Sequence, residues 1–360
     1  MRVVISAGGT GGHIYPALAI INKIKEHEPN SEFLYIGTHN RMENDIVPKK
    51  GIPYKSIEIY GFDRRNLLRN IKVVRCLMKS NKICLKLIKD FNPDIVIGVG
   101  GYVTVPVINS AYKLGIPTLI HEQNSIPGKA NKMLSKKVSK VAVSMKSTLD
   151  DFPSDKVVFT GNPCSEDARI CIPMNKSELG LSNNKKLILI VMGSLGASTI
   201  NNIMVDTLPK LENKDYEVVF VTGKKDYDEI IKNKFPDNIK VVPYIDGMTR
   251  LMKNTDLIVT RAGASTLSEI IALKVPSILI PSPYVPNNHQ YINALDLVKV
   301  NAAELIEEKN LNSEVLINKI DELLNNKDKL NKMKDSLTQL DVKDSAEIIY
   351  QNIKELIERK

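Results

Sequence analysis

A short apolar strand that runs directly into four glycines constrains this chain more than any other feature. Residues 1–5 (MRVVI) predict a buried β-strand, because they are mostly apolar and β-branched. The loop Ser6–His13 (SAGGTGGH) follows, and the spacing of Ala17–Lys25 after Pro16 predicts a helix. Such a loop lets backbone N–H groups approach a ligand, and the helix N-terminus attracts anions. The feature indicates an α/β fold with an anion site at a strand end, or a structural tight turn.

Two common phosphate-binding motifs are excluded by the residues around this loop. A dinucleotide fingerprint has a third glycine where this chain has Ile14, and it has an acid after the second strand. The second expected strand, Phe33–Ile36, ends in Gly37-Thr38 instead. No Gly-Lys-Ser/Thr follows the loop, so it is not a Walker loop. The loop therefore leaves the ligand open, while His13 adds a group that exchanges protons near neutral pH.

Length and composition limit the class of protein. With 360 residues, of which 43% are hydrophobic, the chain is long enough for two domains with sizeable cores. We expect a cytoplasmic, soluble protein, because no charged and apolar leader precedes the first strand and no apolar run approaches the length of a bilayer span. The cysteines lack metal-binding spacing, so we expect reduced thiols (Cys76, Cys84, Cys164 and Cys171). We also expect no bound cofactor.

Basic residues concentrate in one segment, Arg64–Lys89, which we call the basic stripe. This segment has nine lysines and arginines and no acidic residue. Their charge of +9 equals the net charge of the whole chain, so positive and negative charges cancel in the rest of the chain. They recur at helical spacing, which predicts a helix over Asn66–Lys89 with an opposite, core-facing apolar stripe. The residues expected to face the core are Leu67, Ile71, Val74, Met78, Leu85 and Ile88. The basic stripe is either a solvated face or a surface for anionic lipid, and the scarcity of aromatic residues disfavours nucleic acid.

Strands and helices alternate through two similar halves of the chain. The first half predicts strands at Val3–Ser6, Phe33–Ile36, Ile57–Ile59, Asp94–Val99, Thr118–His121, Val138–Val143 and Lys156–Thr160. The second predicts strands at Leu187–Val191, Glu217–Val221, Lys240–Val242, Asp256–Thr260, Ser277–Ile280 and Ala303–Ile306. Each half begins with a strand, a glycine loop and a helix, which indicates two parallel sheets covered on both faces. We expect domains at 1–161 and 164–342, separated by the hinge-like Gly161-Asn162-Pro163, with a last helix, about 343–360, packed back on the first domain.

Seven motifs, in this order, resemble those of one known family. They are GGTGGHIYPALA, GVGGYVTVP, HEQNSIPGKANK, GNP, MGSLGAS, TRAGASTLSE and NNHQYINA, and they span about Met1–Ala294. They closely resemble the peptidoglycan N-acetylglucosaminyltransferases. The resemblance implies a GT-B fold, in which two Rossmann-like domains with parallel sheets face each other across a cleft. It also implies a metal-independent enzyme at the cytoplasmic face of the cell membrane, bound peripherally.

The resemblance also implies a reaction and its partners. N-acetylglucosamine would move with inversion from UDP-N-acetylglucosamine to the C4 hydroxyl of lipid I, which is undecaprenyl-diphospho-N-acetylmuramyl pentapeptide. The products would be lipid II and UDP. The expected partners are these two substrates and an anionic membrane surface, reached through the basic stripe, with no nucleic acid.

The resemblance assigns the donor mainly to the C-terminal half. Ser194 and the N–H groups of Leu195, Gly196 and Ala197 would hold the UDP phosphates at a helix end, in place of a metal. Arg261 would contact phosphate or leaving-group charge, and Glu269 would accept from the ribose hydroxyls. The other expected donor contacts are Thr10, Gly11, Gly12, Asn124, Ile245 (through its backbone), Ala264, Ser265, Thr266, His289 and Gln290. A plain turn, a solvated Glu269 and a surface Gln290 are the structural alternatives.

The acceptor is assigned to the N-terminal half by the same resemblance. Its expected contacts are Gly8, Gly9, Thr10, His13 and Tyr102. His13 is the candidate general base and Glu122 a second candidate catalytic residue in the same region, although a structural or acceptor-binding His13 stays open. His121 is expected to orient its loop.

Two residues depart from the family pattern, and two other functions stay open. Ser165 stands where the family usually has a basic residue after GNP, and Leu195 stands where it usually has glutamine. The alternatives are another UDP-sugar enzyme of this fold, such as a diacylglycerol glycosyltransferase or a sugar epimerase, and a non-catalytic protein that binds lipid or nucleic acid through the basic stripe.

Overall fold

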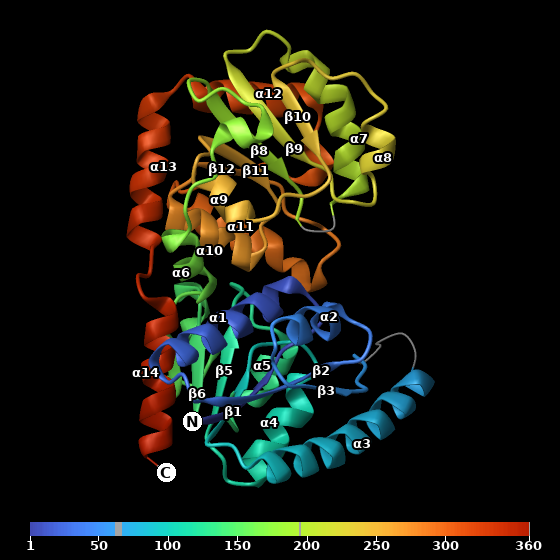
Figure 1. Cartoon of the computed structure of the whole chain (residues 1–360), viewed down its shortest axis with the longest axis vertical. Coiled ribbons are helices and arrows are strands. Elements are labelled where there is room, and N and C mark those ends of the chain that lie inside the picture. The colour runs from blue at the N-terminus through green and yellow to red at the C-terminus, as the bar shows by residue number, and fades with distance from the viewer. Residues whose placement is uncertain (62–66, 194–195, 360) are drawn as a thin grey trace. The chain divides into compact units, whose positions relative to one another are not determined.

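The chain divides into two compact α/β units, each with its own sheet. The computed structural model describes residues 1–61, 67–193 and 196–359, and the side chains of residues 67–69 are also outside the description (Figure 1). Unit 1 consists of Met1–Cys164 and Val342–Lys360, and unit 2 consists of Ser165–Asp341. These limits lie within a few residues of the expected boundaries.

Unit 1 is built on a seven-stranded parallel sheet with the order β3-β2-β1-β4-β5-β6-β7. Its strands are β1 (Arg2–Ser6), β2 (Glu32–Thr38), β3 (Tyr54–Ile57), β4 (Ile95–Gly98), β5 (Thr118–Glu122), β6 (Lys140–Val143) and β7 (Val157–Phe159). Its helices are α1 (Gly11–His27), α2 (Met42–Lys49), α3 (Leu67–Phe91), α4 (Thr104–Lys113), α5 (Lys129–Leu134), the 3₁₀-helix η1 (Lys146–Asp151) and α14 (Ser345–Glu358).

Helices cover both faces of this sheet, and successive side chains of each strand point to opposite faces, so each strand contributes to two cores. On β1, Val3 and Ile5 join the core formed with α1 and α14, while Val4 joins the core formed with α3 and α4. The C-terminal helix α14 lies beside α1, which is the first helix of the chain (Figure 1). Ile349 and Ile353 of α14 are fully buried in that core, so this helix is part of unit 1.

Unit 2 has a six-stranded parallel sheet with the order β10-β9-β8-β11-β12-β13. Its strands are β8 (Lys186–Val191), β9 (Tyr216–Val221), β10 (Ile239–Val242), β11 (Leu257–Thr260), β12 (Ser277–Leu279) and β13 (Glu304–Leu305). Its α-helices are α6 (Cys164–Ile170), α7 (Ser198–Thr207), α8 (Tyr227–Ile230), α9 (Met248–Met252), α10 (Ala264–Leu273), α11 (His289–Val298), α12 (Ser313–Leu324) and α13 (Lys327–Leu340). Its 3₁₀-helices are η2 (Lys176–Leu179), η3 (Leu208–Leu211), η4 (Pro286–Asn288) and η5 (Glu308–Asn310). Strand β8 lies at the centre, so the loop after it sits at the middle of the sheet edge.

The first helix begins earlier than its sequence pattern predicts. Helix α1 starts at Gly11 and contains Pro16, whereas the pattern predicted a start near Ala17. The N–H groups of His13 and Ile14 both donate to Thr10 O, which forms the first turn before the proline. Pro16 has no N–H, so the helical hydrogen bond to Gly12 O is missing from α1. Gly11, Gly12 and His13 therefore lie on the first turn of α1, while Gly8 and Gly9 stay in the loop before it.

The orientation predicted for the long helix α3 is wrong for its middle part. The expected core residues Ile71, Val74 and Met78 are 54%, 43% and 61% exposed, and Leu85 is exposed as well. The helix is buried instead on the face that carries Val73, Cys76, Ser80, Cys84 and Ile88. Small side chains on that face allow close packing, and both Cys76 Sγ and Ser80 Oγ donate to Glu58 O. Of the remaining expected positions, Ile88 is buried as predicted, and Leu67 is among the side chains outside the description.

None of the described helices combines the length and apolar character that crossing a membrane would require.

Candidate functional site

In unit 1, the sequence-predicted residues gather at the carboxyl ends of β1, β4 and β5. His13 Nδ1 lies 2.9 Å from Gly8 O, and since a carbonyl can only accept, Nδ1 carries the proton. The ring lies against Gly100, where a Cβ would approach His13 Cδ2 to 2.5 Å, and Gly100 has a φ of +106°. No described residue bonds Nε2. The imidazole thus keeps one basic nitrogen for a ligand.

The glycine loop offers fewer N–H groups than its sequence predicts. Gly8 N donates to Gly100 O at 3.3 Å, and Gly9 N donates to Glu43 Oε2 at 3.1 Å. Protein acceptors thus already use these two N–H groups, and the expected contact of Gly8 and Gly9 with the acceptor stays a prediction. The N–H groups of Gly11 and Gly12 are on the first turn of α1, where a helix has no internal acceptor. An anion at this loop would meet that turn.

The Glu122 carboxylate is engaged by its own loop. It is 2% exposed, and its oxygens accept from the N–H groups of Gln123, Asn124 and Gly128 and from the side chains of Asn124 and Asn131. These contacts shape the loop after β5 and fix Asn124, which is half-buried. The geometry favours a positioning role for Glu122 over proton transfer.

His121 is buried and neutral. Gln123 Nε2 donates to His121 Nδ1 at 2.9 Å, so Nε2 carries the proton and donates to Gly161 O at 3.2 Å. Burial lowers the pKa of His121 to about 4, since the charged ring would be desolvated. The expected orienting role fits this arrangement. Tyr102, in contrast, lies two residues before α4, is 45% exposed and remains accessible.

In unit 2, the loop after β8 is closed by its own backbone. Gly196 has a φ of +72°, and a Cβ there would lie 2.2 Å from Thr222 O, so only glycine fits. Its N–H donates to Gly193 O at 3.2 Å, and the expected contact of this group with phosphate stays a prediction. Ala197 precedes α7, and Ser194 and Leu195 lie outside the described residues.

Arg261 is held inside unit 2 and does not present a free guanidinium. Its Nη2 lies 2.7 Å from Glu308 Oε2, and its Nη1 donates to Ile280 O at 3.1 Å. Both side chains of the ion pair are about nine-tenths buried. In this structure a buried carboxylate already pairs with the guanidinium, and the expected phosphate contact of Arg261 stays a prediction. Glu308 has no local sequence signal that would have revealed this pairing.

The loops after β11 and β12 place the other donor candidates at one edge of the sheet. Ala264, Ser265 and Thr266 form the first turn of α10, and Ser265 Oγ is buried without a described partner. Glu269, one turn further, is half-buried, and burial and then the charge of Asp167 raise its pKa to about 7. A carboxyl at this pKa can accept from or donate to a hydroxyl near neutral pH.

Two of the expected donor contacts, Gln290 and His289, form hydrogen bonds within the segment after β12. Gln290 Oε1 accepts from Ser282 N at 2.9 Å, which leaves its amide nitrogen for a ligand. His289 Nδ1 donates to Pro286 O at 2.8 Å. Ile245 follows β10, and its side chain is 5% exposed, so only its backbone can be read by a ligand. The carboxyl edges of β8, β11 and β12 thus carry one cluster of candidates.

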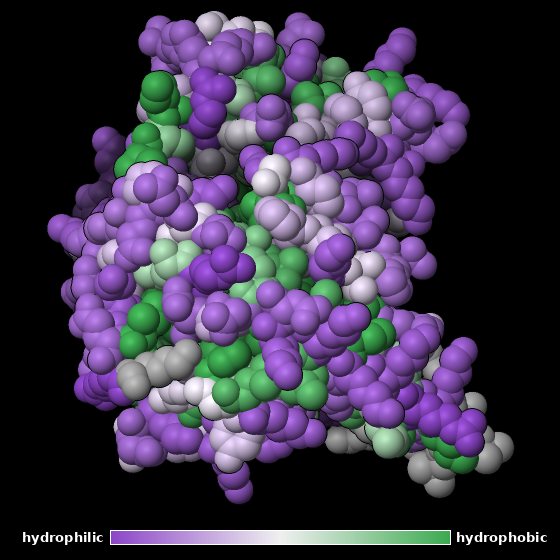
Figure 2. Space-filling model, turned by 60° about the horizontal axis from the view of Figure 1, so that its bottom comes forward, coloured by the Kyte–Doolittle hydropathy of each residue, from purple (hydrophilic) through white to green (hydrophobic). Residues whose placement is uncertain are grey.

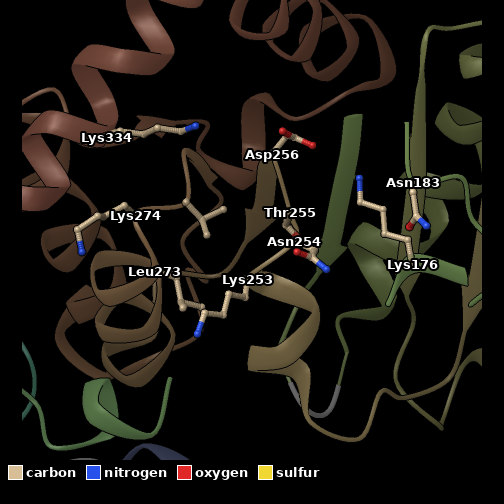
Figure 3. Close-up of a pocket in the computed structure, with 10 residues that line it drawn as sticks. Lys176, Asn183, Lys253, Asn254, Thr255, Asp256, Leu273, Lys274 and Lys334 are labelled. Atoms are coloured by element: carbon tan, nitrogen blue, oxygen red, sulfur yellow. The ribbon is translucent and has the colours of Figure 1, made fainter. Parts of the chain in front are cut away.

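A cavity of about 440 Å³ lies at the opposite edge of this sheet. Its lining residues Asp256 and Val275 come before β11 and β12, which places the cavity at the amino ends of these strands. Figure 3 shows four lysines around it: Lys176, Lys253, Lys274 and Lys334. Lys253 Nζ donates to two carbonyls at 2.7 Å, Lys176 Nζ to Lys185 O at 2.8 Å, and Lys274 pairs with Asp341. Three of the four ammonium groups are therefore satisfied by the protein, and the cavity is separate from the candidate donor cluster.

Comparisons with known proteins match each half of the chain to a family model. The family models described as the glycosyltransferase family 28 N-terminal domain and C-terminal domain match residues 3–143 and 187–349. A UDP-N-acetylglucosamine--N-acetylmuramyl-(pentapeptide) pyrophosphoryl-undecaprenol N-acetylglucosamine transferase of Bacillus cytotoxicus is 48% identical over 364 aligned positions, covering 100% of both chains. The Bacillus licheniformis protein of the same name is 48% identical and covers 99% of both chains.

A solved structure extends the comparison to the fold. The crystal structure of Acinetobacter baumannii MurG has a TM-score of 0.78 and 28% identity, and the match covers 98% of this chain and 99% of that one. The expected fold class, two Rossmann-like α/β domains with parallel sheets as in GT-B glycosyltransferases, is confirmed. The chain belongs to glycosyltransferase family 28 and, within it, to the MurG family of N-acetylglucosaminyltransferases.

Proposed function

We propose that this protein transfers N-acetylglucosamine from UDP-N-acetylglucosamine to lipid I and releases lipid II and UDP. The observation that carries the proposal is the 48% identity, over the full length of both chains, to transferases named for this reaction. The site chemistry supports it, because unit 1 offers a basic imidazole nitrogen and unit 2 offers helix N-termini and a hydroxyl-binding carboxyl.

In this proposal His13 is the general base. Its Nε2 takes the proton of the acceptor C4 hydroxyl while that oxygen bonds to the anomeric carbon of the donor. The bond from this carbon to the UDP oxygen breaks at the same time, its electrons leave with UDP, and the configuration inverts. The hydrogen bond from Nδ1 to Gly8 O keeps Nε2 as the nitrogen that lacks a proton.

Unit 2 would bind the donor without a metal. The first turns of α7 and α10 offer N–H groups to the diphosphate, and Ser265 Oγ offers a buried hydroxyl. Glu269 would contact the ribose hydroxyls, the backbone of Ile245 the uracil, and the free amide nitrogen of Gln290 the sugar. Asn124 of unit 1 remains a proposed contact to the same sugar. The acceptor diphosphate would meet the first turn of α1 and Tyr102.

We also propose that unit 1 binds the cytoplasmic face of the membrane peripherally through α3. Ile71, Val74, Met78 and Leu85 form an exposed apolar row on this helix, at spacings of three, four and seven. Exposed lysines and arginine flank the row: Lys72, Arg75, Lys79, Lys82 and Lys86. Figure 2, in which the bottom of the molecule comes forward, shows hydrophobic areas among hydrophilic ones on that side. Apolar residues beside lysines suit the boundary between anionic headgroups and acyl chains.

The test is release of UDP from UDP-N-acetylglucosamine in the presence of a soluble lipid I analogue, with and without EDTA. We expect release that requires the acceptor and is unchanged by EDTA. Diacylglycerol as acceptor, and a search for an epimerised sugar without acceptor, are run in parallel. Transfer only to diacylglycerol, or formation of an epimer, would overturn the proposal in favour of another UDP-sugar enzyme.

A further inference from the structure

A buried carboxylate lies against the glycine loop and takes no part in the reaction outlined above. Glu43, the second residue of α2, is 0% exposed. Its Oε2 accepts from Gly9 N at 3.1 Å, and its Oε1 accepts from Thr38 N at 3.2 Å and Thr38 Oγ1 at 2.6 Å. A buried carboxylate is costly unless donors surround it. These three donors, at the N-terminus of a helix, offset that cost.

The peptide group between Gly8 and Gly9 connects this carboxylate to the imidazole of His13. The N–H that donates to Glu43 and the carbonyl that accepts from His13 Nδ1, at 2.9 Å, belong to the same peptide. In a trans peptide these two groups point in opposite directions, so Glu43 and His13 bond opposite ends of one planar unit. Hydrogen bonds in such a chain polarise one another. A negative charge at the N–H end makes Gly8 O a stronger acceptor for the imidazole N–H.

Glycines leave the space that this chain of contacts needs. A Cβ on Gly8 would lie 2.5 Å from Glu43 Oε1, and a Cβ on Gly37 would lie 2.9 Å from Glu43 Cγ. Gly9 has a φ of +96°, which side chains rarely tolerate. The glycine loop therefore serves two purposes: it admits a ligand, and it admits the carboxylate.

We propose that Glu43 is a positioning residue that acts on His13 through the Gly8–Gly9 peptide. It fixes Nδ1 as the protonated nitrogen and makes Nε2 more basic. The inference rests on the proposed function, in which Nε2 takes the proton of the acceptor hydroxyl. The arrangement resembles a catalytic carboxylate–histidine pair with a peptide group between the two side chains.

The other titratable groups around this chain of contacts do not change charge near neutral pH. Tyr35 on β2 donates to Ala7 O, and Tyr54 on β3 donates to Thr38 O. Burial and then the charge of Glu43 raise the pKa of both tyrosines. Burial and then the charge of His13 lower the pKa of His121 on β5 to about 4. Glu269 of unit 2 has a pKa raised to about 7, so the report on His13 is the difference in the acid limb between Glu43→Gln and the wild type, which share Glu269.

The first test compares Glu43→Gln with Asp45→Asn, which removes the same charge from an exposed position of the same helix. For Glu43→Gln we expect kcat to fall about 10- to 100-fold, the loss that is usual when the hydrogen-bond partner behind a metal-binding histidine is removed. The acid limb of the kcat/KM profile should move to lower pH, because a less basic imidazole loses its proton earlier, while KM for UDP-N-acetylglucosamine stays within about twofold. Asp45→Asn should match the wild type. A kcat loss without a shift of the limb would indicate a merely structural role and overturn the proposal.

A second test uses the coupling between the two residues. In a His13→Ala background, Glu43→Gln should cost less than about twofold, because residues that act as a unit are not additive. Full additivity of the two losses would contradict an action through His13.

A third readout does not need activity. The chain has five histidines, so ¹⁵N NMR can assign the His13 ring and its tautomer. We expect a protonated Nδ1 in the wild type and a mixture of tautomers in folded Glu43→Gln. An unchanged tautomer would overturn the inference. A wild type that is folded and transfers nothing would instead defeat the proposed function, while the NMR comparison would still test the link between Glu43 and His13.

Discussion

The two units contain the same device, a strand, a glycine loop and a helix, but its donors have different partners. After β1, side-chain and backbone acceptors from elsewhere in unit 1 take the N–H groups of Gly8 and Gly9. After β8, Gly196 bonds its own turn and packs on Thr222 O. The sequence motif predicts that the backbone is approached closely at both places. The residues that surround each glycine loop in the folded unit decide whether its N–H groups bind a ligand or other parts of the protein.

Charge separates the two devices further. In unit 1 a carboxylate and an imidazole lie on either side of one peptide, an arrangement suited to moving a proton. In unit 2 the nearby arginine is neutralised by Glu308, and Glu269 is shifted towards its neutral form. At this edge, the described part of unit 2 therefore offers backbone dipoles and polar side chains, while the charge of Arg261 is already paired. The comparison is consistent with the proposal that unit 1 transfers the proton and unit 2 binds the donor.

The largest effect should come from His13. We expect His13→Ala to lower kcat by about 10²- to 10⁴-fold, which is the usual contribution of a general base. The measurement is acceptor-dependent UDP release at saturating substrates. UDP affinity should stay unchanged, because the proposed donor contacts are mainly in unit 2. A tenfold loss of UDP affinity with an intact kcat would reverse the roles that we assign to the two loops.

Breaking the buried ion pair of unit 2 should have the next largest effect. Glu308→Ala leaves the Arg261 guanidinium buried without its carboxylate and should lower the free energy of unfolding by about 3–5 kcal/mol. The double variant Arg261→Met/Glu308→Leu should recover most of this loss, because both charges are gone. Urea unfolding measures both. Unchanged stability of Glu308→Ala together with altered UDP affinity would show that Arg261 serves the donor after all.

Glu269 should make the stability of unit 2 depend on pH. Its carboxyl titrates near 4.5 when unfolded and at about 7 when folded, so between these values the folded state binds more protons. The free energy of unfolding therefore falls as pH rises through this window, by at most about 3 kcal/mol and by less for a half-buried group. Urea unfolding from about pH 5 to about pH 9 measures the slope.

Matched variants identify the source of that slope. Glu269→Gln should flatten it and weaken UDP binding, whereas the exposed Glu229→Gln should leave the slope unchanged. A slope that persists in Glu269→Gln would mean that other groups carry the pH dependence.

Local patterns predict the fold well and the partners of site residues poorly. The alternation of strands and helices indicates two parallel sheets, and the motifs at strand ends mark the edges where His13, Glu122 and Glu269 lie. Glu43 and Glu308 escape such reasoning, because each meets its partner only through the folded sheet. The apolar row Ile71, Val74 and Met78 escapes it for another reason: α3 has apolar residues on two faces, and periodicity does not say which one packs.

The smallest expected effect concerns this exposed row and its basic neighbours. Neutralising one exposed lysine, Lys79→Gln, should weaken binding to anionic vesicles by about 1 kcal/mol, or about fivefold. Lys234→Gln removes the same charge from the surface of unit 2 and should have no effect. Co-sedimentation with vesicles of anionic and of neutral lipid measures both variants, and added salt should abolish the difference between them. Equal losses for the two variants would mean that net charge alone drives binding, and the distinction between a membrane-binding unit 1 and a donor-binding unit 2 would fail.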